Sequence, residues 1–387
     1  MPSTPLKNLI YRAALPFEAP SPRGQMTHAA KGQPLCRMAD YERLLVRHHV
    51  LGATLLLSDS QRTAVLHTST NKPRHIAQDD TIYRVASITK MATALVTLSC
   101  ITEGVFTLDT PVRSLLPDTP NAAMLDGVTV RHLLSHTSGL IDLPAMDAAL
   151  RDGRSYDDVL AAPGICAAKP GQQLIYSNFG FGLLGCMLEN VTGLCIEALF
   201  QARLFAPLGM RATLDASTLD EHLIMPISRV LPYHAGRDVT ITALGRKPIE
   251  EPDPLRHFGH TAGAMYTDAP SLVKLLQLIH HRGMHEGQQL ISAGLMAEMT
   301  REQSATPTRR YGLGLVILEL PKLLPRRLLG HQGFAYGCVD GAFIEEDTGR
   351  LVIFLNGGAS EARQGKLGLV NRDLLTWALT KEMPSWT

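Results

Sequence analysis

Residues 83–103 read YRVASITKMATALVTLSCITE, and this stretch guides the interpretation of the whole chain. Apolar side chains recur from Ile88 to Ile101 with almost no wide polar face, so a helix formed here would be buried on most sides. Gly104 follows the run, and glycine commonly ends a helix because it tolerates the left-handed conformation. The sequence therefore predicts a buried helix at the centre of the fold.

The head of this apolar run carries the S-x-x-K tetrad Ser87-Ile88-Thr89-Lys90. Residues three apart lie on one face of a helix, so the Ser87 hydroxyl and the Lys90 amine can approach each other. A serine becomes a nucleophile when a base takes its proton, and a lysine is such a base only when its pKa falls. Burial and the helix N-terminus both lower it, and the N–H groups there can hold an oxyanion. The tetrad also occurs by chance, so its meaning depends on the rest of the chain.

Composition describes an ordinary globular protein. The chain has 387 residues, 45% of them hydrophobic and 19% charged, with a net charge of +1. This balance gives no reason to expect a nucleic-acid partner. No apolar run reaches the ~18 residues that a membrane span needs, so we predict no membrane span. The oligomeric state is left open.

The first 38 residues carry no clear signal-peptide core, because Tyr11 and Arg12 interrupt the apolar stretch from Leu9 to Leu15. Glu18 is the only acid in residues 1–38, which faintly resembles an organelle transit peptide. Five prolines within residues 1–24 favour an extended arm. The six cysteines form no C-x-x-C pair, so a reduced, cytoplasmic compartment fits best.

Strand-like runs lie at both ends of the chain. Ala39–His49 has helical spacing and precedes two β-rich runs, Gly52–Leu57 and Thr63–Thr68, which form a hairpin signal. Between residues 107 and 309 short helices and loops dominate, and residues 211–262 are mostly loop. Four more β-like runs follow, and these are Gly314–Glu319, Arg327–His331, Gly337–Glu345 and Arg350–Leu355. A helix at Leu367–Leu379 closes the chain.

The economical fold is therefore α+β, with one antiparallel sheet made from the two chain ends, flanked by terminal helices, and a helical domain inserted between them. We predict an N-terminal arm at 1–38 and a catalytic domain at 39–387. Within that domain, 39–106 and 310–387 form the α/β part, and 107–309 form the mainly helical part.

Two tripeptides supply further candidate groups. In Tyr176-Ser177-Asn178, a tyrosinate, or a tyrosine coupled to the lysine, can shuttle a proton, and the asparagine amide can orient the lysine or a substrate carbonyl. In His331-Gln332-Gly333, the glycine allows close backbone approach of a ligand, and the histidine can offer a hydrogen bond or a positive charge near a substrate. The N–H of Phe334 could act as a second oxyanion donor. When either tripeptide occurs alone, it most often has a structural role and no catalytic one.

No cofactor or metal is expected. The hexapeptide at 180–185, GFGLLG, matches G-x-G-x-x-G, but it follows no strand, so we interpret its glycines as a sign of close helix packing. His280, His281 and His285 cluster near one helix end, where Glu286 alone is thin support for a metal site.

Taken in order, these motifs resemble the serine β-lactamase-like hydrolases, nearest to the branch of class C β-lactamases, D,D-peptidases and family VIII carboxylesterases. The stretch HLLSHTSGL at 132–140 is similar to the characteristic loop of that family, and Gly259–Asp268 and GHQGFAYG at 330–337 add support. The resemblance covers about residues 40 to 380 and implies a β-lactamase/transpeptidase-like fold.

The resemblance also implies roles for individual residues. Ser87 would be the acylated nucleophile, with Lys90 and Tyr176 as coupled general base and acid. Asn178 would assist the substrate or the lysine. The backbone N–H groups of Ser87 and Phe334 would form the oxyanion hole. The substrate-binding residues on the edge strand would be His331, Gln332 and Gly333.

The chain departs from class C β-lactamases at one motif. They carry K-T-G where this chain has His331-Gln332-Gly333, and that lysine and threonine help to hold the β-lactam carboxylate. The resemblance therefore implies a serine hydrolase acting on a small-molecule ester or amide, most simply a carboxylesterase for small or medium acyl groups. The alternatives are a β-lactamase or a D-Ala or D-amino-acid peptidase, an acyltransferase, and a non-catalytic scaffold or sensor.

Overall fold

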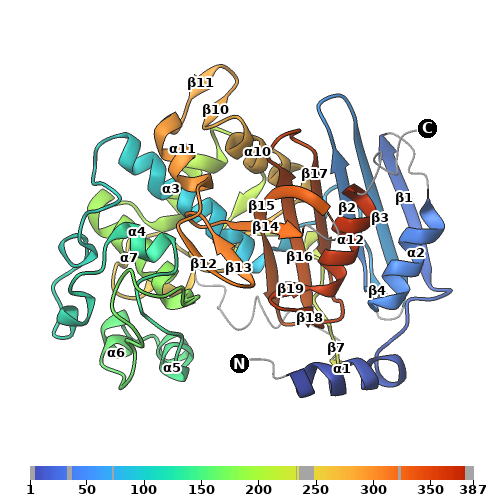
Figure 1. Cartoon of the computed structure of the whole chain (residues 1–387), viewed down its shortest axis with the longest axis horizontal. Helices are drawn as coiled ribbons and strands as arrows, with labels where there is room; N and C mark the ends of the chain where they lie inside the picture. The colour runs from blue at the N-terminus through green and yellow to red at the C-terminus, as the bar shows by residue number, and fades with distance from the viewer. Residues whose placement is uncertain are drawn as a thin grey trace.

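The centre of the molecule is one antiparallel sheet that combines strands from both ends of the chain (Figure 1). The computed structural model describes residues 5–32, 37–71, 74–231, 233–234, 248–320 and 324–379. The strand order is β1-β3-β2-β17-β16-β15-β14-β13-β12, with β4 (Arg74–His75) beside β3. The strands are β1 (Met26–Gly32), β2 (Ala53–Ser58), β3 (Thr63–Asn71), β12 (Ser304–Thr306), β13 (Arg309–Tyr311), β14 (Val316–Leu320), β15 (Leu324–Ala335), β16 (Cys338–Glu345) and β17 (Leu351–Asn356).

The pairing of β2 with β17 joins the two ends of the chain. Ser58 pairs with Leu351 and Ala53 with Asn356 in an antiparallel register. The predicted hairpin is also present, because β2 pairs with β3 from Ala53 to Ser58. The prediction of one antiparallel sheet made from both chain ends is confirmed.

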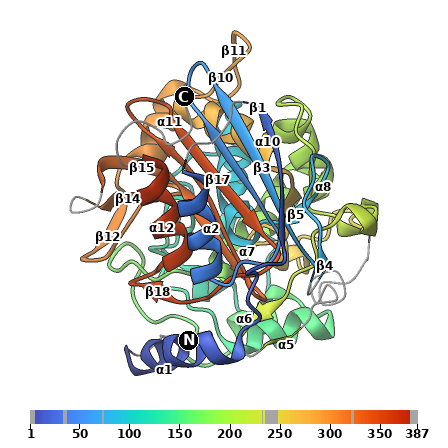
Figure 2. The ribbon, with the colours of Figure 1, turned by 90° about the vertical axis from the view of Figure 1, so that its right-hand side faces the viewer.

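Helices cover both faces of this sheet. On one face α2 (Met38–Arg47) and α12 (Leu369–Leu379) lie side by side (Figure 2), and the Tyr41 and Trp377 rings meet with their centroids 5.6 Å apart. On the other face α10 (Ala269–His280) packs against β16 and β17. Every residue of β2 and β17 is therefore buried, and successive side chains enter opposite cores. Leu55 packs with the α2 and α12 side, whereas Leu56 packs with the helical side.

The helical part surrounds α3 (Thr89–Thr102), the helix predicted from the opening stretch. Every residue of α3 from Thr89 to Cys100 is buried, which confirms the predicted burial. It packs against α7 (Asn178–Thr192) and α8 (Ile196–Phe200). The helical part also contains α4 (Val130–Leu134), α5 (Pro144–Asp152), α6 (Tyr156–Leu160) and α11 (Ala293–Thr300). Within the described ranges, no single helix has the length and apolar character to cross a membrane, although the bent pair 178–192 and 196–205 meets both criteria jointly.

The prediction of an arm over residues 1–38 is wrong for two segments. Residues Pro5–Glu18 form helix α1, and Met26–Gly32 form β1, an edge strand paired with β3. Proline is tolerated at the first position of a helix, so Pro5 does not prevent α1. The β1 side chains are mostly exposed, and an exposed edge strand leaves little hydrophobic alternation in the sequence.

Three boundaries also differ from the prediction. The α-helix begins at Thr89, because Tyr83–Arg84 form strand β5 and Ala86–Ile88 form a 3₁₀ turn. The sheet extends past the predicted boundary at residue 310, since β12 begins at Ser304. Residues 211–262 contain short strands and 3₁₀ turns between loops, but 232 and 235–247 lie outside the described residues. Cys36 also lies outside them, and the other five cysteines are free thiols.

Candidate active site

Ser87 lies in the 3₁₀ turn that joins β5 to α3. The residue before it, Ala86, has a φ of +46°, in the left-handed region that non-glycine residues rarely adopt. This conformation costs roughly 1–2 kcal/mol, so the surrounding structure must hold it. Strained backbone of this kind is common at functional sites. No sequence signal identified it, because alanine has no preference for a positive φ.

Lys90 is fully buried one turn further along, and its Nζ lies 3.3 Å from Ser87 Oγ. The amine donates hydrogen bonds to Asn178 Oδ1 at 2.8 Å and to the Ala262 carbonyl oxygen at 2.6 Å. Burial lowers the pKa of Lys90 from 10.5 to about 7, although the Asp142 carboxylate opposes the shift. A neutral amine that donates both hydrogens to these two acceptors keeps its lone pair for the Ser87 proton. The arrangement therefore suits a general base.

Two glycines of α7 allow the segment that carries the Ala262 carbonyl to lie against this helix. A Cβ at Gly182 would lie 2.0 Å from the Phe258 carbonyl oxygen. One at Gly185 would lie 2.7 Å from Thr261 Oγ1. The interpretation of the G-x-G-x-x-G pattern as close packing is confirmed.

Tyr176 completes the contacts of the nucleophile, because its hydroxyl donates to Ser87 Oγ at 2.9 Å. Desolvation raises the pKa of Tyr176 above its ordinary value, so the resting form is the neutral phenol. The His136 ring stacks on Tyr176 with centroids 4.3 Å apart, and His136 Nδ1 accepts the Ser177 N–H at 3.3 Å. His136 thus holds the Tyr176 segment in position.

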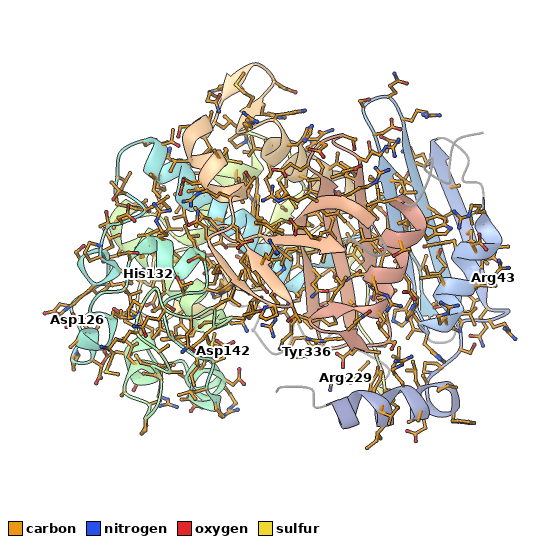
Figure 3. All side chains as sticks on the ribbon, viewed as in Figure 1. Arg43, Asp126, His132, Asp142, Arg229 and Tyr336 are labelled. Atoms are coloured by element: carbon orange, nitrogen blue, oxygen red, sulfur yellow. The ribbon has the colours of Figure 1, made fainter. Side chains whose placement is uncertain are left out.

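Asp142 holds the start of α7 and was not predicted from the sequence (Figure 3). Its Oδ1 accepts the backbone N–H groups of Asn178 at 2.7 Å and Phe179 at 3.0 Å. Its Oδ2 accepts the Asn178 side-chain amide at 2.8 Å, so Asn178 Oδ1 is turned toward Lys90. A single aspartate far from any motif gives no sequence signal for this role.

The His331 side chain is buried on β15, and its Nδ1 bonds to the Gln332 carbonyl at 2.6 Å. Burial lowers the pKa of His331 to about 3, with the Lys90 charge acting in the same direction. Burial thus favours the neutral imidazole near pH 7, and the part that His331 plays toward a substrate stays a prediction. Its Nε2 is buried and has no partner within the described residues.

Both ends of the Gln332 side-chain amide are engaged with protein groups. Nε2 donates to the Lys366 carbonyl at 2.5 Å, and Oε1 accepts the Gly368 N–H at 3.0 Å. Gln332 therefore ties β15 to the hairpin of β18 (Arg363–Gln364) and β19 (Leu367–Gly368).

Gly333 lets β15 approach the turn that carries Ser87. A Cβ on Gly333 would lie 2.3 Å from the Val85 carbonyl oxygen and 3.3 Å from Ala86 Cβ. The first distance is far below van der Waals contact, so any side chain here must displace the turn or the strand. The segment that lies close to Gly333 is thus the Val85–Ala86 turn, and the approach of a ligand to this glycine stays a prediction.

We expect Gly333→Ala to displace Ser87 from its partners. Overpacking of this kind should lower the free energy of unfolding by about 1–3 kcal/mol. A misplacement near 1 Å should lower kcat/KM for an ester by about a hundredfold. Urea unfolding and steady-state kinetics measure the two effects. The control is Gly294→Ala in α11, where a Cβ meets nothing within 4 Å. Wild-type kinetics in a folded Gly333→Ala protein would contradict the expected displacement.

A hollow of about 220 Å³ brings most of the predicted site residues together. Those that line it are Ser87, Tyr176, Asn178, His331, Gln332 and Phe334. Lys90 lies buried behind Ser87, and the oxyanion role of the Phe334 N–H stays a prediction. The lining residues that sequence reasoning missed are Arg309, Tyr311, Val316, Arg363 and Lys366. They belong to no motif, and only the pairing of strands brings them together.

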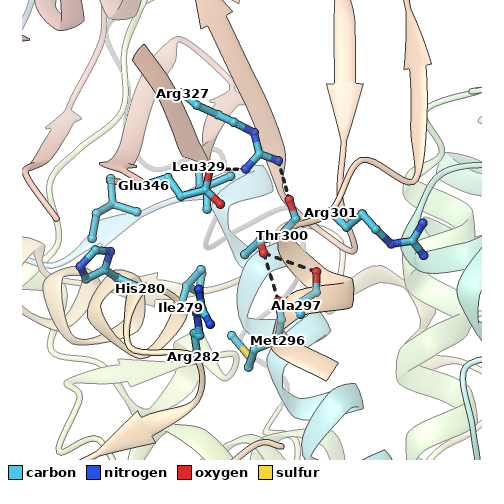
Figure 4. A pocket seen from close by; sticks show the side chains of 11 residues that line it. Ile279, His280, Arg282, Met296, Ala297, Thr300, Arg301, Arg327, Leu329 and Glu346 are labelled. Carbon is cyan, nitrogen blue, oxygen red and sulfur yellow. Dashed lines mark hydrogen bonds and ion pairs between the residues drawn. The ribbon is translucent and has the colours of Figure 1, made fainter. Parts of the chain in front are cut away.

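A second hollow, of about 450 Å³, lies elsewhere, between α10, α11 and the sheet (Figure 4). Two of the three arginines that line it are engaged with protein groups. Arg327 pairs with Glu346 and donates to the Thr300 carbonyl at 2.7 Å. Arg301 pairs with Glu298. None of its lining residues is a serine, cysteine or lysine, so the larger hollow offers no arrangement comparable to that around Ser87.

An antiparallel sheet with an inserted helical region, and an S-x-x-K serine between β15 and α7, define the β-lactamase-fold serine hydrolases. Comparison with family models agrees with this class. The Beta-lactamase family model matches residues 37–372, and the chain belongs to this family.

Individual relatives carry several different activities in their names. The chain is 28% identical to penicillin-binding protein 4 of Amycolatopsis lactamdurans over 277 residues, 68% of each chain. It is 32% identical to esterase EstB of Burkholderia gladioli over 218 residues, 51% of each chain. It thus spans about two thirds of the first relative and half of the second. Among solved structures, a D-stereospecific amidohydrolase from Streptomyces sp. has a TM-score of 0.63 at 26% identity, covering 85% of this chain and 94% of that one.

Proposed function

We propose that the protein is a carboxylesterase that hydrolyses small or medium acyl esters through an acyl-enzyme at Ser87. The observation that carries this proposal is that Ser87 Oγ contacts both a proton acceptor, the neutral Lys90 amine, and a proton donor, the Tyr176 phenol. Lys90, at 3.3 Å, has a pKa of about 7, and Tyr176, at 2.9 Å, is a neutral phenol. A base and an acid thus flank one hydroxyl.

In acylation, neutral Lys90 takes the Ser87 proton as Oγ forms a bond to the ester carbonyl carbon. The oxyanion would be held by the N–H groups of Ser87 and Phe334. When the bond to the leaving alkoxide breaks, the Tyr176 hydroxyl gives the alkoxide its proton. The Lys90 ammonium then restores the proton on Tyr176, which leaves a neutral amine beside the acyl-enzyme.

In deacylation, the same groups act in reverse on water. A water molecule loses its proton to Lys90 as its oxygen attacks the acyl carbon. The bond between that carbon and Ser87 Oγ then breaks, and Oγ is protonated from Lys90 or Tyr176. The carboxylic acid leaves, and the resting network is restored.

The residues at the position of the K-T-G motif favour ester substrates over β-lactams. The lysine and threonine of the K-T-G motif are replaced by His331 and Gln332, and neither supplies a charge. The relatives include both esterase EstB and penicillin-binding protein 4, and one is named monacolin J acid methylbutanoyltransferase. Peptidase, β-lactamase and acyltransferase activities are therefore the competing enzymatic functions, and a scaffold or sensor is the non-catalytic one.

A paired hydrolysis assay tests this proposal. We expect 4-nitrophenyl butanoate to be turned over with a kcat/KM at least about tenfold above that for a chromogenic cephalosporin, because His331 and Gln332 replace the edge-strand lysine and threonine that position a lactam carboxylate. Preferential turnover of the cephalosporin would reject the esterase in favour of a β-lactamase. If neither is turned over, the esterase proposal also fails. Intact-mass detection of acylated Ser87 would then indicate an acyltransferase, and its absence a scaffold.

A further inference from the structure

Three cationic side chains line the hollow beside Ser87, and no acidic residue is among its lining residues. Arg309 comes from β13 and Arg363 from β18, while Lys366 lies in the turn before β19. All three are half-buried. A carboxylate substituent on a substrate would enter this hollow without meeting a like charge on its wall.

Within the described residues, none of these three side chains has an ion pair or a side-chain hydrogen bond. Their neighbours in the chain differ in this respect. Arg310, which follows Arg309 on β13, pairs with Glu302 at 2.9 Å and with Glu319 at 3.5 Å. The Glu361 carboxylate, whose charge raises the pKa of Arg363, has its Oε2 atom 3.8 Å from Arg229 Nε. A half-buried cation without a counterion is unfavourable, so an anion from outside would be bound with a gain.

The two arginines converge on the reacting groups. Arg309 and Arg363 line the same hollow as Ser87 and Tyr176, and burial lowers the pKa of both guanidinium groups. Both stay charged, because arginine does not lose its proton in proteins. The Arg363 guanidinium stacks on the Phe334 ring, 3.8 Å from its centroid. Stacking occupies the face of the guanidinium and leaves the N–H groups on its edge for a planar anion.

The geometry points to an anion subsite formed by Arg309, Arg363 and Lys366, so that the preferred ester carries a carboxylate on its acyl or its alcohol part. This inference rests on the proposed function and specifies its substrate class. The absence of the K-T-G lysine does not leave the hollow uncharged. The positive charge comes instead from β13 and from the β18–β19 hairpin.

Two pairs of esters test the subsite. The first is the 4-nitrophenyl monoester of adipic acid and its methyl-capped diester, which differ in a charge on the acyl part. The second is 4-carboxyphenyl butanoate and its methyl ester, which differ in a charge on the leaving group. The readout is the ratio of kcat/KM, charged over neutral, within each pair. Because Arg309 and Arg363 also lie near Tyr176, this ratio reports the subsite better than an absolute rate.

We expect a ratio above one in at least one pair. It should fall about ten- to a hundredfold in Arg309→Gln and in Arg363→Gln, as expected for losing a hydrogen bond between charged groups. The control is Arg310→Gln, in which a paired arginine on the same strand is removed and the ratio should not change. Ratios near one in both pairs, or a preference that survives in both variants, would overturn the inference.

Binding to the Ser87→Ala protein separates this inference from the proposed function. Calorimetry should detect tighter binding of the charged member of the preferred pair than of its neutral partner. If that difference is present while the wild type turns over no ester, the anion subsite stands and the esterase proposal fails. If esters are turned over without any charge preference, the esterase stands and the subsite fails.

Discussion

Replacing Ser87 with alanine should abolish ester turnover while leaving the fold intact. The Ser87 hydroxyl lies within 3.3 Å of both Lys90 and Tyr176, and no other described residue combines these two contacts. We expect kcat to fall by about a thousandfold or more, because covalent catalysis is lost and only binding and oxyanion stabilisation remain. The wild type, quenched during turnover, should gain the mass of one acyl group on the peptide that contains Ser87.

The matched control is Ser60→Ala, which removes an exposed hydroxyl in the turn between β2 and β3. It should keep wild-type kinetics and carry no acyl group. If the Ser87→Ala protein is folded and still hydrolyses esters at the wild-type rate, Ser87 is not the nucleophile and the mechanism proposed for this hollow is wrong.

Replacing Lys90 with methionine should have the second largest effect. Removing a general base costs about a hundred- to ten-thousandfold in rate. In the wild type, kcat/KM should rise with pH and reach half its plateau near pH 7, because the neutral amine is the active form and its pKa is about 7. The residual activity of Lys90→Met should lack this rise. A flat wild-type profile between pH 6 and 9 would show that Lys90 is not the base.

The same substitution changes how stability depends on pH. Between pH 7 and 10.5, the unfolded chain holds a proton on Lys90 that the folded chain has lost. Unfolding therefore takes up a proton, and the stability of the wild type relative to Lys90→Met rises with pH across this window. The slope is about 1.4 kcal/mol per pH unit, and it disappears below the folded and above the unfolded pKa. Urea unfolding at both ends of the window measures it.

Lys169→Met provides the control for both measurements, because Lys169 is exposed. It should show the wild-type pH–rate profile and no pH-dependent difference in stability. A stability difference between the wild type and Lys90→Met that stays constant from pH 7 to 10.5 would mean that burial does not lower the pKa of Lys90.

The sequence predicted the parts of the fold whose patterns are local. The buried helix α3 and the strands β2 and β17 are continuous apolar runs, and continuous runs mark elements covered on both faces. Edge strand β1 was not predicted, because its stability comes from backbone pairing with β3 and its side chains are mostly exposed. Its sequence, MTHAAKG, has no period that would distinguish a strand from a loop.

The candidate site divides in the same way. Ser87, Lys90 and Tyr176 belong to motifs, and the structure brings them together. Asp142 acts through hydrogen bonds to the start of α7, and Arg309 and Arg363 reach the hollow through strand pairing. These three are single polar residues in unremarkable surroundings, so their roles depend on contacts between distant segments that no local pattern encodes.

The pairing of β2 with β17 also determines when the protein can become active. Ser58 pairs with Leu351, and Gly333 lies against the turn that carries Ser87. The nucleophile is therefore synthesised long before the strand that completes its pocket. Contacts between such distant segments slow folding, because a long loop must close before they form. During synthesis, β2 and β3 remain a hairpin with an open edge that invites aggregation. Appearance of activity thus reports the last step of folding, the docking of the C-terminal strands.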